Sequence, residues 1–259
     1  VAVGACGLVA QVVVMRELCT SFHGNELTIG LVMAAWLCLE ALGALSARWA
    51  FRASRAFPTH RSARARPLYL AYLGVFLVSI LLLPLSLWMG RLIRLILGVP
   101  TGHALGLKEI LTACVLVSLP VSVPHGALFA LACESYSCAS DHLQWATARV
   151  YVWETAGTLA GAGLLTLFLA DYQSFEIVTA TVAVGIVCWL FVSFRLMEGH
   201  RSRTIVLATG VVLLLAVGIA WAGRYPSYLH RLSAALRWQG HQVVVYLDSR
   251  YGNVAVIRT

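Results

Sequence analysis

Three ionisable side chains lie deep within apolar stretches of the sequence, and they are the first candidates for chemistry. Glu40 and Glu154 each lie well inside an apolar stretch, and His125 follows a pair of prolines in a third. A charged side chain in the middle of a bilayer costs at least roughly 2.5 to 3.5 kcal/mol on insertion scales, so carboxylates at such depth are functional candidates. Glu40 and Glu154 predict a cation or proton site that would suit a polyamine or another amine.

The same two carboxylates also have a structural interpretation. Arg16 or Lys108 could neutralise them in an internal ion pair that fixes the register of the helices. Each of these basic residues stands directly before a glutamate, as Arg16-Glu17 and Lys108-Glu109, near the end of an apolar stretch. Because long basic side chains reach the interface from such positions, we expect the adjacent pairs to be structural.

His125 is the best single candidate for a membrane-embedded ligand or proton relay. Pro120 and Pro124 remove two backbone donors close to it, within SLPVSVPHG, which predicts a kink or local unwinding. Transporters often break helices at their binding sites, but prolines also bend helices for packing alone. Both interpretations remain open from the sequence.

The composition indicates that membrane helices position these residues. Of the 259 residues, 60% are hydrophobic and 12% are charged, and the mean hydropathy is +0.82. Ordinary soluble domains are about a quarter charged, so a water-soluble fold would lack a polar surface. Several apolar stretches are long enough to cross about 30 Å of hydrocarbon as helices. We predict an all-α polytopic bundle of about seven helices, with spans at 1–20, 27–50, 68–90, 106–131, 146–170, 175–195 and 204–222.

The basic residues predict the orientation of this bundle. The net charge of +8 falls mainly between the apolar stretches, as for residues that orient helices in a bilayer, and not as for a nucleic-acid interface. Segment 51–67 carries five arginines, segment 195–203 carries three, and Arg149 makes nine, against Arg91, Arg94 and Lys108 on the other side. We expect segments 51–67 and 195–203 to face the cytoplasm of a bacterial inner membrane, and the C-terminal segment to lie in the periplasm.

Three further patterns concern packing and metals. RLIRLILGVP, at 91–100, is amphipathic and too short to span, which predicts an interfacial or re-entrant segment. Gly157 and Gly161 form a small-xxx-small face beside Glu154, which predicts close helix packing or a homo-oligomer contact. The seven cysteines include one close pair, Cys133 and Cys138, but neither CxxCH nor paired CxxC occurs. We expect no disulfide framework, no metal and no cofactor in this chain.

Residues 223–259 differ in character from the rest. Two β-rich runs, Gln242–Leu247 and Asn253–Ile257, flank DSRYG, which has turn residues and predicts a β-hairpin. A lone two-stranded hairpin is marginal in water, so we expect it to open a soluble α/β domain that continues beyond Thr259. Val1 falls inside an apolar stretch, so we expect residues to precede it. The predicted domains are a bundle over 1–222 and a linker with hairpin over 223–259.

The hairpin resembles the opening strands of the spermidine synthase (polyamine aminopropyltransferase) family. That family begins with a pattern like YQ-x-I-x-V, followed by a YG turn and a second apolar strand; here the glutamine is Gln242 and the turn is Tyr251-Gly252. His241 stands where the family usually has Tyr. The resemblance implies that Gln242 helps to bind the aminopropyl donor nucleoside, decarboxylated S-adenosylmethionine, provided that the whole domain is active.

The apolar part is similar to the membrane half of bacterial proteins that fuse a helical bundle to a spermidine-synthase-like domain. The stretches that carry this likeness are GACGLVAQVVVMREL, FHGNELTIGLVMAAWLCLEALGA, SLPVSVPHGALFAL and VYVWETAGTLAGAGLL. The family's glycine-rich nucleotide loop and its acidic residues would lie downstream of Thr259. This chain therefore holds no complete catalytic site, and no catalytic residue is assigned in it.

Three classes of function remain open. The first is the membrane domain of an aminopropyltransferase-like protein, whose soluble domain is either active or repurposed. The second is a non-catalytic anchor or scaffold subunit of a larger complex. The third is a transporter of a small amine. A periplasmic hairpin would separate the soluble domain from a cytoplasmic donor nucleoside, which favours a repurposed domain within the first class.

Overall fold

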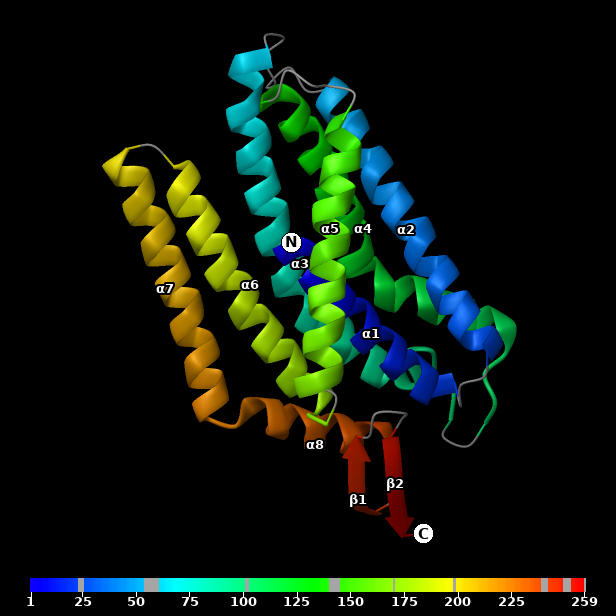
Figure 1. Cartoon of the computed structure of the whole chain (residues 1–259). Helices are drawn as coiled ribbons and strands as arrows, with labels where there is room; N and C mark the ends of the chain where they lie inside the picture. Colours follow the sequence, from blue (N-terminus) through cyan, green and yellow to red (C-terminus); the bar gives the residue numbers. More distant parts are fainter. Residues whose placement is uncertain are drawn as a thin grey trace.

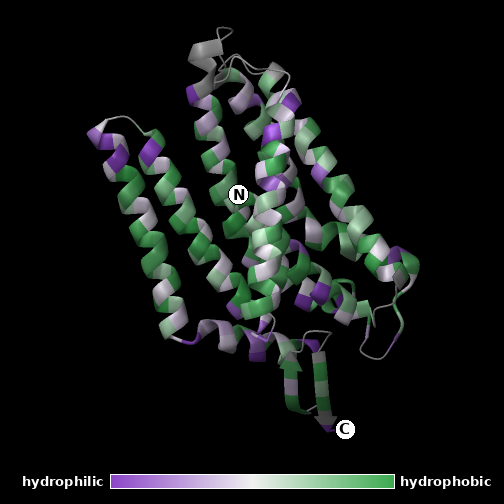
Figure 2. Cartoon of the chain, viewed as in Figure 1, coloured by the Kyte–Doolittle hydropathy of each residue, from purple (hydrophilic) through white to green (hydrophobic). Residues whose placement is uncertain are grey.

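A computed structural model describes residues 1–22, 26–53, 61–100, 103–139, 145–169, 171–197, 199–238, 242–248 and 253–258. Seven helices in this part of the chain are long and apolar enough to cross a membrane, so the protein is a multi-pass membrane bundle. They are α1 (Ala2–Phe22), α2 (Glu26–Ala53), α3 (Arg61–Ile96), α4 (Leu107–Ala139), α5 (Ala146–Leu164), α6 (Ser174–Leu196) and α7 (His200–Ala222). Their middles are apolar and most of their polar residues lie near their ends (Figure 2).

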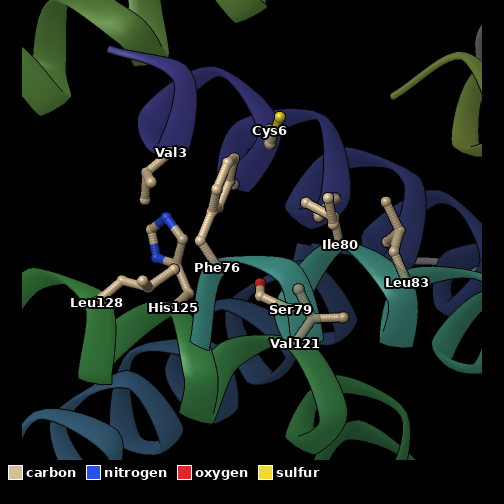
Figure 3. Close-up of a pocket in the computed structure, with 11 residues that line it drawn as sticks. Val3, Cys6, Phe76, Ser79, Ile80, Leu83, Val121, His125 and Leu128 are labelled. Carbon is tan, nitrogen blue, oxygen red and sulfur yellow. The ribbon is translucent and has the colours of Figure 1, made fainter. Parts of the chain in front are cut away.

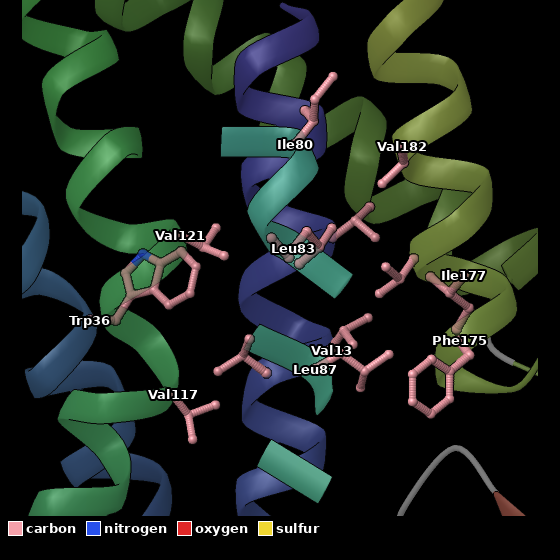
Figure 4. Packing of buried hydrophobic residues seen from close by; sticks show 14 of the residues in the cluster. Val13, Trp36, Ile80, Leu83, Leu87, Val117, Val121, Phe175, Ile177 and Val182 are labelled. Carbon is pink, nitrogen blue, oxygen red and sulfur yellow. The ribbon is translucent and has the colours of Figure 1, made fainter. Parts of the chain in front are cut away.

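Helix α1 lies inside the bundle, where it packs against α2, α3, α4, α5 and α6 (Figure 1). Its residues Val13, Val14 and Leu18 are at most 1% exposed. Figure 4 shows the core around it, with Val117 and Val121 of α4 on one side and Phe175 and Ile177 of α6 on the other. Helix α7 packs only against α6 and α8 and stays at the periphery. A polar group on α1 is therefore surrounded by protein and not by lipid.

Both ends of the bundle carry basic residues. Helices α2, α4 and α6 finish at one end, called here the head, which carries Arg48, Arg66, Arg149, Arg195, Arg201 and Arg203. Helices α1, α3 and α7 finish at the opposite end, called here the foot (Figure 1), which carries Arg16, Arg91, Arg94, Arg224, Arg231 and Arg237. The hairpin lies at the foot, opposite to the head, as the count of seven spans predicts.

An eighth helix, α8 (Tyr225–Arg237), lies across the foot and is absent from the sequence prediction, which gave a linker here. Arg224 has a positive φ of 55°, and this left-handed residue turns the chain out of α7, while Pro226 stands in the first turn of α8. Pro226, His230, Ser233 and Ala234 are buried, whereas Tyr225 and Tyr228 are more than half exposed. Such a two-sided helix suits the boundary between protein and interface.

The hairpin is formed by β1 (Gln242–Asp248) and β2 (Asn253–Arg258). The strands are antiparallel, with Gln242 opposite Arg258 and Asp248 opposite Asn253, and the register shifts at a bulge between Val243 and Val245. This confirms the predicted hairpin. The residues described contain no α/β domain, and the predicted turn at 249–252 lies outside them.

Two local predictions need correction. The stretch 91–100 does not form a separate short segment, because α3 continues through it to Ile96 with Arg91 and Arg94 only 1% and 6% exposed. Of the kink or local unwinding predicted at Pro120 and Pro124, the unwinding is absent, since α4 is helical from Leu107 to Ala139. A proline inside a helix leaves one carbonyl without its usual donor, but the helix continues past both prolines here. The irregular turn lies elsewhere, in the π-helical segment η2 (Leu165–Leu169) after α5.

Candidate functional site

The three candidate residues Glu40, His125 and Glu154 meet in the structure. They come from the middles of α2, α4 and α5. The Nδ1 atom of His125 lies 2.7 Å from Oε1 of Glu40, and its Nε2 atom lies 3.7 Å from Oε1 of Glu154. The imidazole thus stands between two carboxylates and directs one ring nitrogen toward each. His125 occupies the partner position for which the sequence offered Arg16 or Lys108.

Glu40 is the more tightly held of the two carboxylates. The indole Nε1 of Trp36 donates a hydrogen bond of 2.7 Å to Oε1 of Glu40, the same atom that faces His125. Trp36 precedes Glu40 by one helical turn, so both side chains lie on one face of α2. Trp36 itself is 2% exposed. By contrast, Glu154 lies 3.7 Å from the His125 ring, beyond hydrogen-bond distance, which leaves its carboxylate available to other groups.

Glycines bring the four surrounding helices together around this cluster. A Cβ atom on Gly43 or Gly126 would collide with the backbone of the partner helix in the α2–α4 contact. Gly4 stands against the carbonyl of Glu154, and Gly161 would place a Cβ 2.8 Å from the carbonyl oxygen of Ala5. Small residues allow such approach between membrane helices. The face formed by Gly157 and Gly161 is therefore covered by α1 of the same chain.

Gly7 has a specific role in this packing. A Cβ atom there would overlap the His125 ring at Nε2, so the absence of a side chain on α1 makes the space in which the imidazole sits. Any larger residue at position 7 would push His125 away from its position between the carboxylates. The sequence pattern GACG at the start of α1 carries this signal, although it does not reveal which helix approaches it.

The cluster forms part of a cleft of about 570 Å3 between α1, α2, α4 and α5. Glu40, His125 and Glu154 are between 15% and 23% exposed, so they are in contact with this space and are not sealed from it. The remaining lining is largely small or aliphatic, and it also includes aromatic rings and polar side chains. The aromatic and polar residues are Trp36, Phe129, Tyr151, Gln11, Thr155 and Thr158.

A second, much smaller cavity lies on the other side of the His125 ring. Its volume is about 10 Å3, near the space that one water molecule needs. Figure 3 shows His125, Ser79 and Phe76 around it, together with Val3 of α1 and Leu128 of α4. The walls are mostly apolar. This space is too small for an organic ligand, so the larger cleft is the candidate site.

The arrangement suits the binding of an organic cation better than the binding of a metal ion. Both ring nitrogens of His125 face carboxylates, so neither points with them to a common centre. Among the residues that the structure describes, no group of three or more His, Cys, Asp or Glu side chains could hold a metal ion. Cys133 and Cys138 are separate free thiols. Two carboxylates, an imidazole and aromatic faces are groups that attract organic cations.

A second charged cluster, missed by the sequence analysis, lies at the foot. Arg91 of α3 and Glu17 of α1 form a two-point ion pair, with nitrogen to oxygen distances of 2.8 and 3.1 Å, and both side chains are fully buried. The hydroxyl of Ser174 donates to Glu17 over 2.6 Å. The guanidinium also lies 3.2 Å from Nδ1 of His230 on α8.

This cluster, called here the foot network, also holds the hairpin. The Arg91 guanidinium lies 5.5 Å from the ring centre of Tyr246 on β1 and 5.4 Å from that of Phe175. Tyr246 meets His230 edge to face at 5.2 Å. Nearby, Arg94 and Arg237 donate to the carbonyls of Ser21 and Thr20 at the end of α1, where a helix has unsatisfied acceptors. An arginine and a glutamate inside apolar helical stretches were the signal for it.

The remaining predicted site residue, Gln242, opens β1 at the foot, where its backbone pairs opposite Arg258. Its side chain, like Tyr251 and Gly252 of the predicted turn, lies outside the described residues. The family resemblance of the hairpin thus concerns a part of the molecule separate from the Glu40–His125–Glu154 cluster.

The chain was compared with protein families, with curated proteins and with solved structures. No family model, no curated protein and no solved structure matches this chain. The functional argument therefore depends on the geometry of the two clusters.

Proposed function

We propose that this chain is the membrane domain of an aminopropyltransferase-like protein and that its bundle binds an organic amine in the cleft. The observation that carries the amine site is the convergence of Glu40, His125 and Glu154 on one cleft of about 570 Å3. Two carboxylates placed by α2 and α5 in the middle of apolar helices are costly unless they meet a positive charge. An ammonium group supplies that charge.

The lining favours an organic cation over an inorganic one. Phe129 and Tyr151 present aromatic rings, which attract ammonium groups and pack against alkyl chains. The volume is within the range of small-molecule sites, about 300 to 1,000 Å3. A small hard cation would need an oxygen cage, whereas one carboxylate here is already engaged by Trp36 and His125. An alkyl amine uses all of these features together.

Calorimetric titration of the purified protein in lipid nanodiscs with 1,4-diaminobutane tests this proposal. We expect binding that weakens at least tenfold, or about 1.4 kcal/mol, in Glu40→Gln and in Glu154→Gln. Glu109→Gln serves as the matched control, because Glu109 lies on α4 but outside the cleft. Absence of 1,4-diaminobutane binding by the wild type, or equal binding by all three variants, would contradict the amine site.

The proposed family rests on the hairpin and on its resemblance to the opening strands of polyamine aminopropyltransferases. The antiparallel pairing of β1 with β2 supports this assignment. In an active full-length protein, Gln242 would contact decarboxylated S-adenosylmethionine, and the transferase reaction would take place in residues beyond Thr259. An aminopropyl transfer assay on the full-length protein, with Gln242→Ala as variant, tests it: activity lost in the variant supports the assignment, and no activity supports a repurposed domain.

The proposed orientation places the head in the cytoplasm of a bacterial inner membrane and the foot in the periplasm. The basic segments 51–67 and 195–203 support it. Reporters that are active on only one side of the membrane, fused after Thr259, test it. Periplasmic activity agrees with seven spans and makes polyamine synthesis from a cytoplasmic donor improbable. Cytoplasmic activity contradicts the orientation and restores the ordinary transferase reaction.

A second candidate is a scaffold that carries an extramembrane domain without binding an amine. The foot network favours it, because Arg91 connects the bundle to α8 and to the hairpin in a single buried cluster. Its partner would be another protein at the foot. The Gly157 and Gly161 face, covered by α1, is not available for a homo-oligomer. Co-purification of a partner that is lost on removal of residues 242–259, without any amine binding, would favour this candidate.

A further inference from the structure

The position of His125 between two carboxylates limits how many positive charges the cleft can hold. We propose that the cleft exchanges a proton on His125 for the second positive charge of a diamine, so that its proper ligand is a dication. This inference rests on the proposed amine site and adds to it the ligand class and a link to protons. It follows from the charge of three side chains and their contacts.

With both carboxylates ionised, the charge count has two cases. With His125 protonated, the cluster carries two negative charges and one positive charge, and one ammonium group makes it neutral. With His125 neutral, the cluster carries two negative charges, and two ammonium groups make it neutral. Because uncompensated charge is costly in a membrane, both neutral combinations are favoured over the others. A dication therefore binds with release of the His125 proton to solvent, whereas a monocation binds without it.

The geometry agrees with this exchange. Glu40 and Glu154 lie on opposite sides of the imidazole ring, one at Nδ1 and one at Nε2. A single ammonium group cannot reach both carboxylates while the ring stands between them. Two ammonium groups joined by a short alkyl chain can, and the aromatic walls of the cleft would pack against that chain. A neutral His125 can then keep one hydrogen bond to Glu40 through Nδ1.

Other titratable groups near the cluster do not change the count. Glu40 and Glu154 are the acids facing His125 from α2 and α5, and Tyr151 of α5 also lines the cleft. From α1, Cys6 lines the small cavity beside the ring. Tyr72 of α3 and Cys133 of α4 lie within electrostatic range of Glu154. These phenols and thiols are neutral near pH 7. The amine of Val1 would add a positive charge near Glu154 if it were a free terminus. The protein used for the test therefore carries additional residues before Val1, which remove this charge.

Calorimetric titrations with 1,4-diaminobutane and 1-aminobutane test this exchange, because the two probes share a chain and differ by one charge. The wild type in nanodiscs is titrated in phosphate and in HEPES, whose different ionisation enthalpies report the protons released. We expect the diamine to release about one proton more per site than the monoamine. We also expect its affinity to rise about tenfold per pH unit where His125 is protonated, with a flat profile for the monoamine.

Two variants assign the proton to His125. In His125→Gln the extra proton release by the diamine disappears and its affinity no longer depends on pH. In Glu154→Gln the diamine loses its advantage over the monoamine, because one negative charge is gone. Glu109→Gln behaves as the wild type. If His125→Gln does not fold, the pH dependence of the wild-type affinity for the diamine and for the monoamine still tests the proton exchange.

The outcomes separate this inference from the proposed function. Equal proton release by both probes, or equal pH profiles, overturns the exchange while the amine site stands. Proton release that persists in a folded His125→Gln variant also overturns it. If neither probe binds, the amine site itself is wrong and the exchange falls with it.

Discussion

The cleft cluster and the foot network are both acid–base groups on membrane helices, and they differ in how completely their charges are satisfied. At the foot, Glu17 and Arg91 are fully buried, paired at two points, and supported by Ser174 and His230. In the cleft, the acids are about one fifth exposed, and Glu154 approaches His125 only to 3.7 Å. The acids of the cleft adjoin a space of about 570 Å3.

The difference shows that a buried charge is by itself a weak sign of a binding site. The foot network joins α1, α3, α6, α8 and β1, and all of its strong contacts are made within the chain. The cleft cluster leaves one carboxylate without a short hydrogen bond and opens it to space. We therefore expect substitutions at the foot to lower the free energy of unfolding, and substitutions in the cleft to lower ligand affinity with a smaller effect on stability.

The largest effect is expected from Arg91→Met, which leaves Glu17 charged and buried without its partner. Breaking one half of a buried pair costs about 3 to 5 kcal/mol. Thermal unfolding in detergent should show a large decrease in Tm. The double variant Glu17→Leu with Arg91→Met should recover part of it, because no lone charge then remains. A decrease of the same size in His125→Gln would erase the distinction between the two clusters.

Gly7→Ala should have the next largest effect, since its Cβ atom would overlap the ring of His125. Overpacking of this kind costs about 1 to 3 kcal/mol. We expect a moderate decrease in Tm together with loss of diamine binding, because the imidazole no longer stands between the carboxylates. Gly30→Ala on α2 is the control, with no atom within 4 Å of its added Cβ. Unchanged binding in Gly7→Ala would show that the ring position is unimportant.

Tyr246→Ala tests the part of the foot network that connects it to the hairpin and leaves the Glu17–Arg91 ion pair in place. It removes the ring that Arg91 and His230 contact, and such contacts contribute about 0.5 to 2 kcal/mol. Hydrogen exchange should become faster in β1 and β2 while the middle of α4 stays protected. Val244→Ala, on the same strand with a side chain 60% exposed, should leave exchange unchanged. Equal acceleration in both variants would mean that Tyr246 does not fasten the hairpin.

Hydropathy and turn residues predicted the seven spans and the hairpin, because the lengths of apolar runs and strand patterns are local properties. Which faces of the helices meet is not local. The sequence singled out Glu40, Glu154 and His125, but it offered Arg16 or Lys108 as the partner, since nothing in a single sequence gives the rotation of α4 against α2 and α5. The functional role of the three residues stays a prediction.

The foot was predicted least well. Charged residues were used to end the spans, which placed Arg91 in a loop, although the buried Glu17 allows α3 to continue through it. Helix α8 was missed although YPSYLHRLSAALR carries its signals, a proline in the first turn and apolar residues at helical spacing.

The smallest effect on stability, and the sharpest test of the comparison, is expected from Glu154→Gln. Its carboxylate lies 3.7 Å from His125, beyond hydrogen-bond distance, and is partly exposed. Loss of this charge should therefore change the free energy of unfolding by less than about 1 kcal/mol. Diamine affinity should nevertheless fall at least tenfold. Glu17→Gln is the counterpart at the foot, where the same change of one atom should lower Tm strongly and leave diamine affinity unaltered. If Glu154→Gln instead destabilises the bundle as much as Glu17→Gln, both clusters hold the fold together, and the open carboxylate is not kept for a ligand.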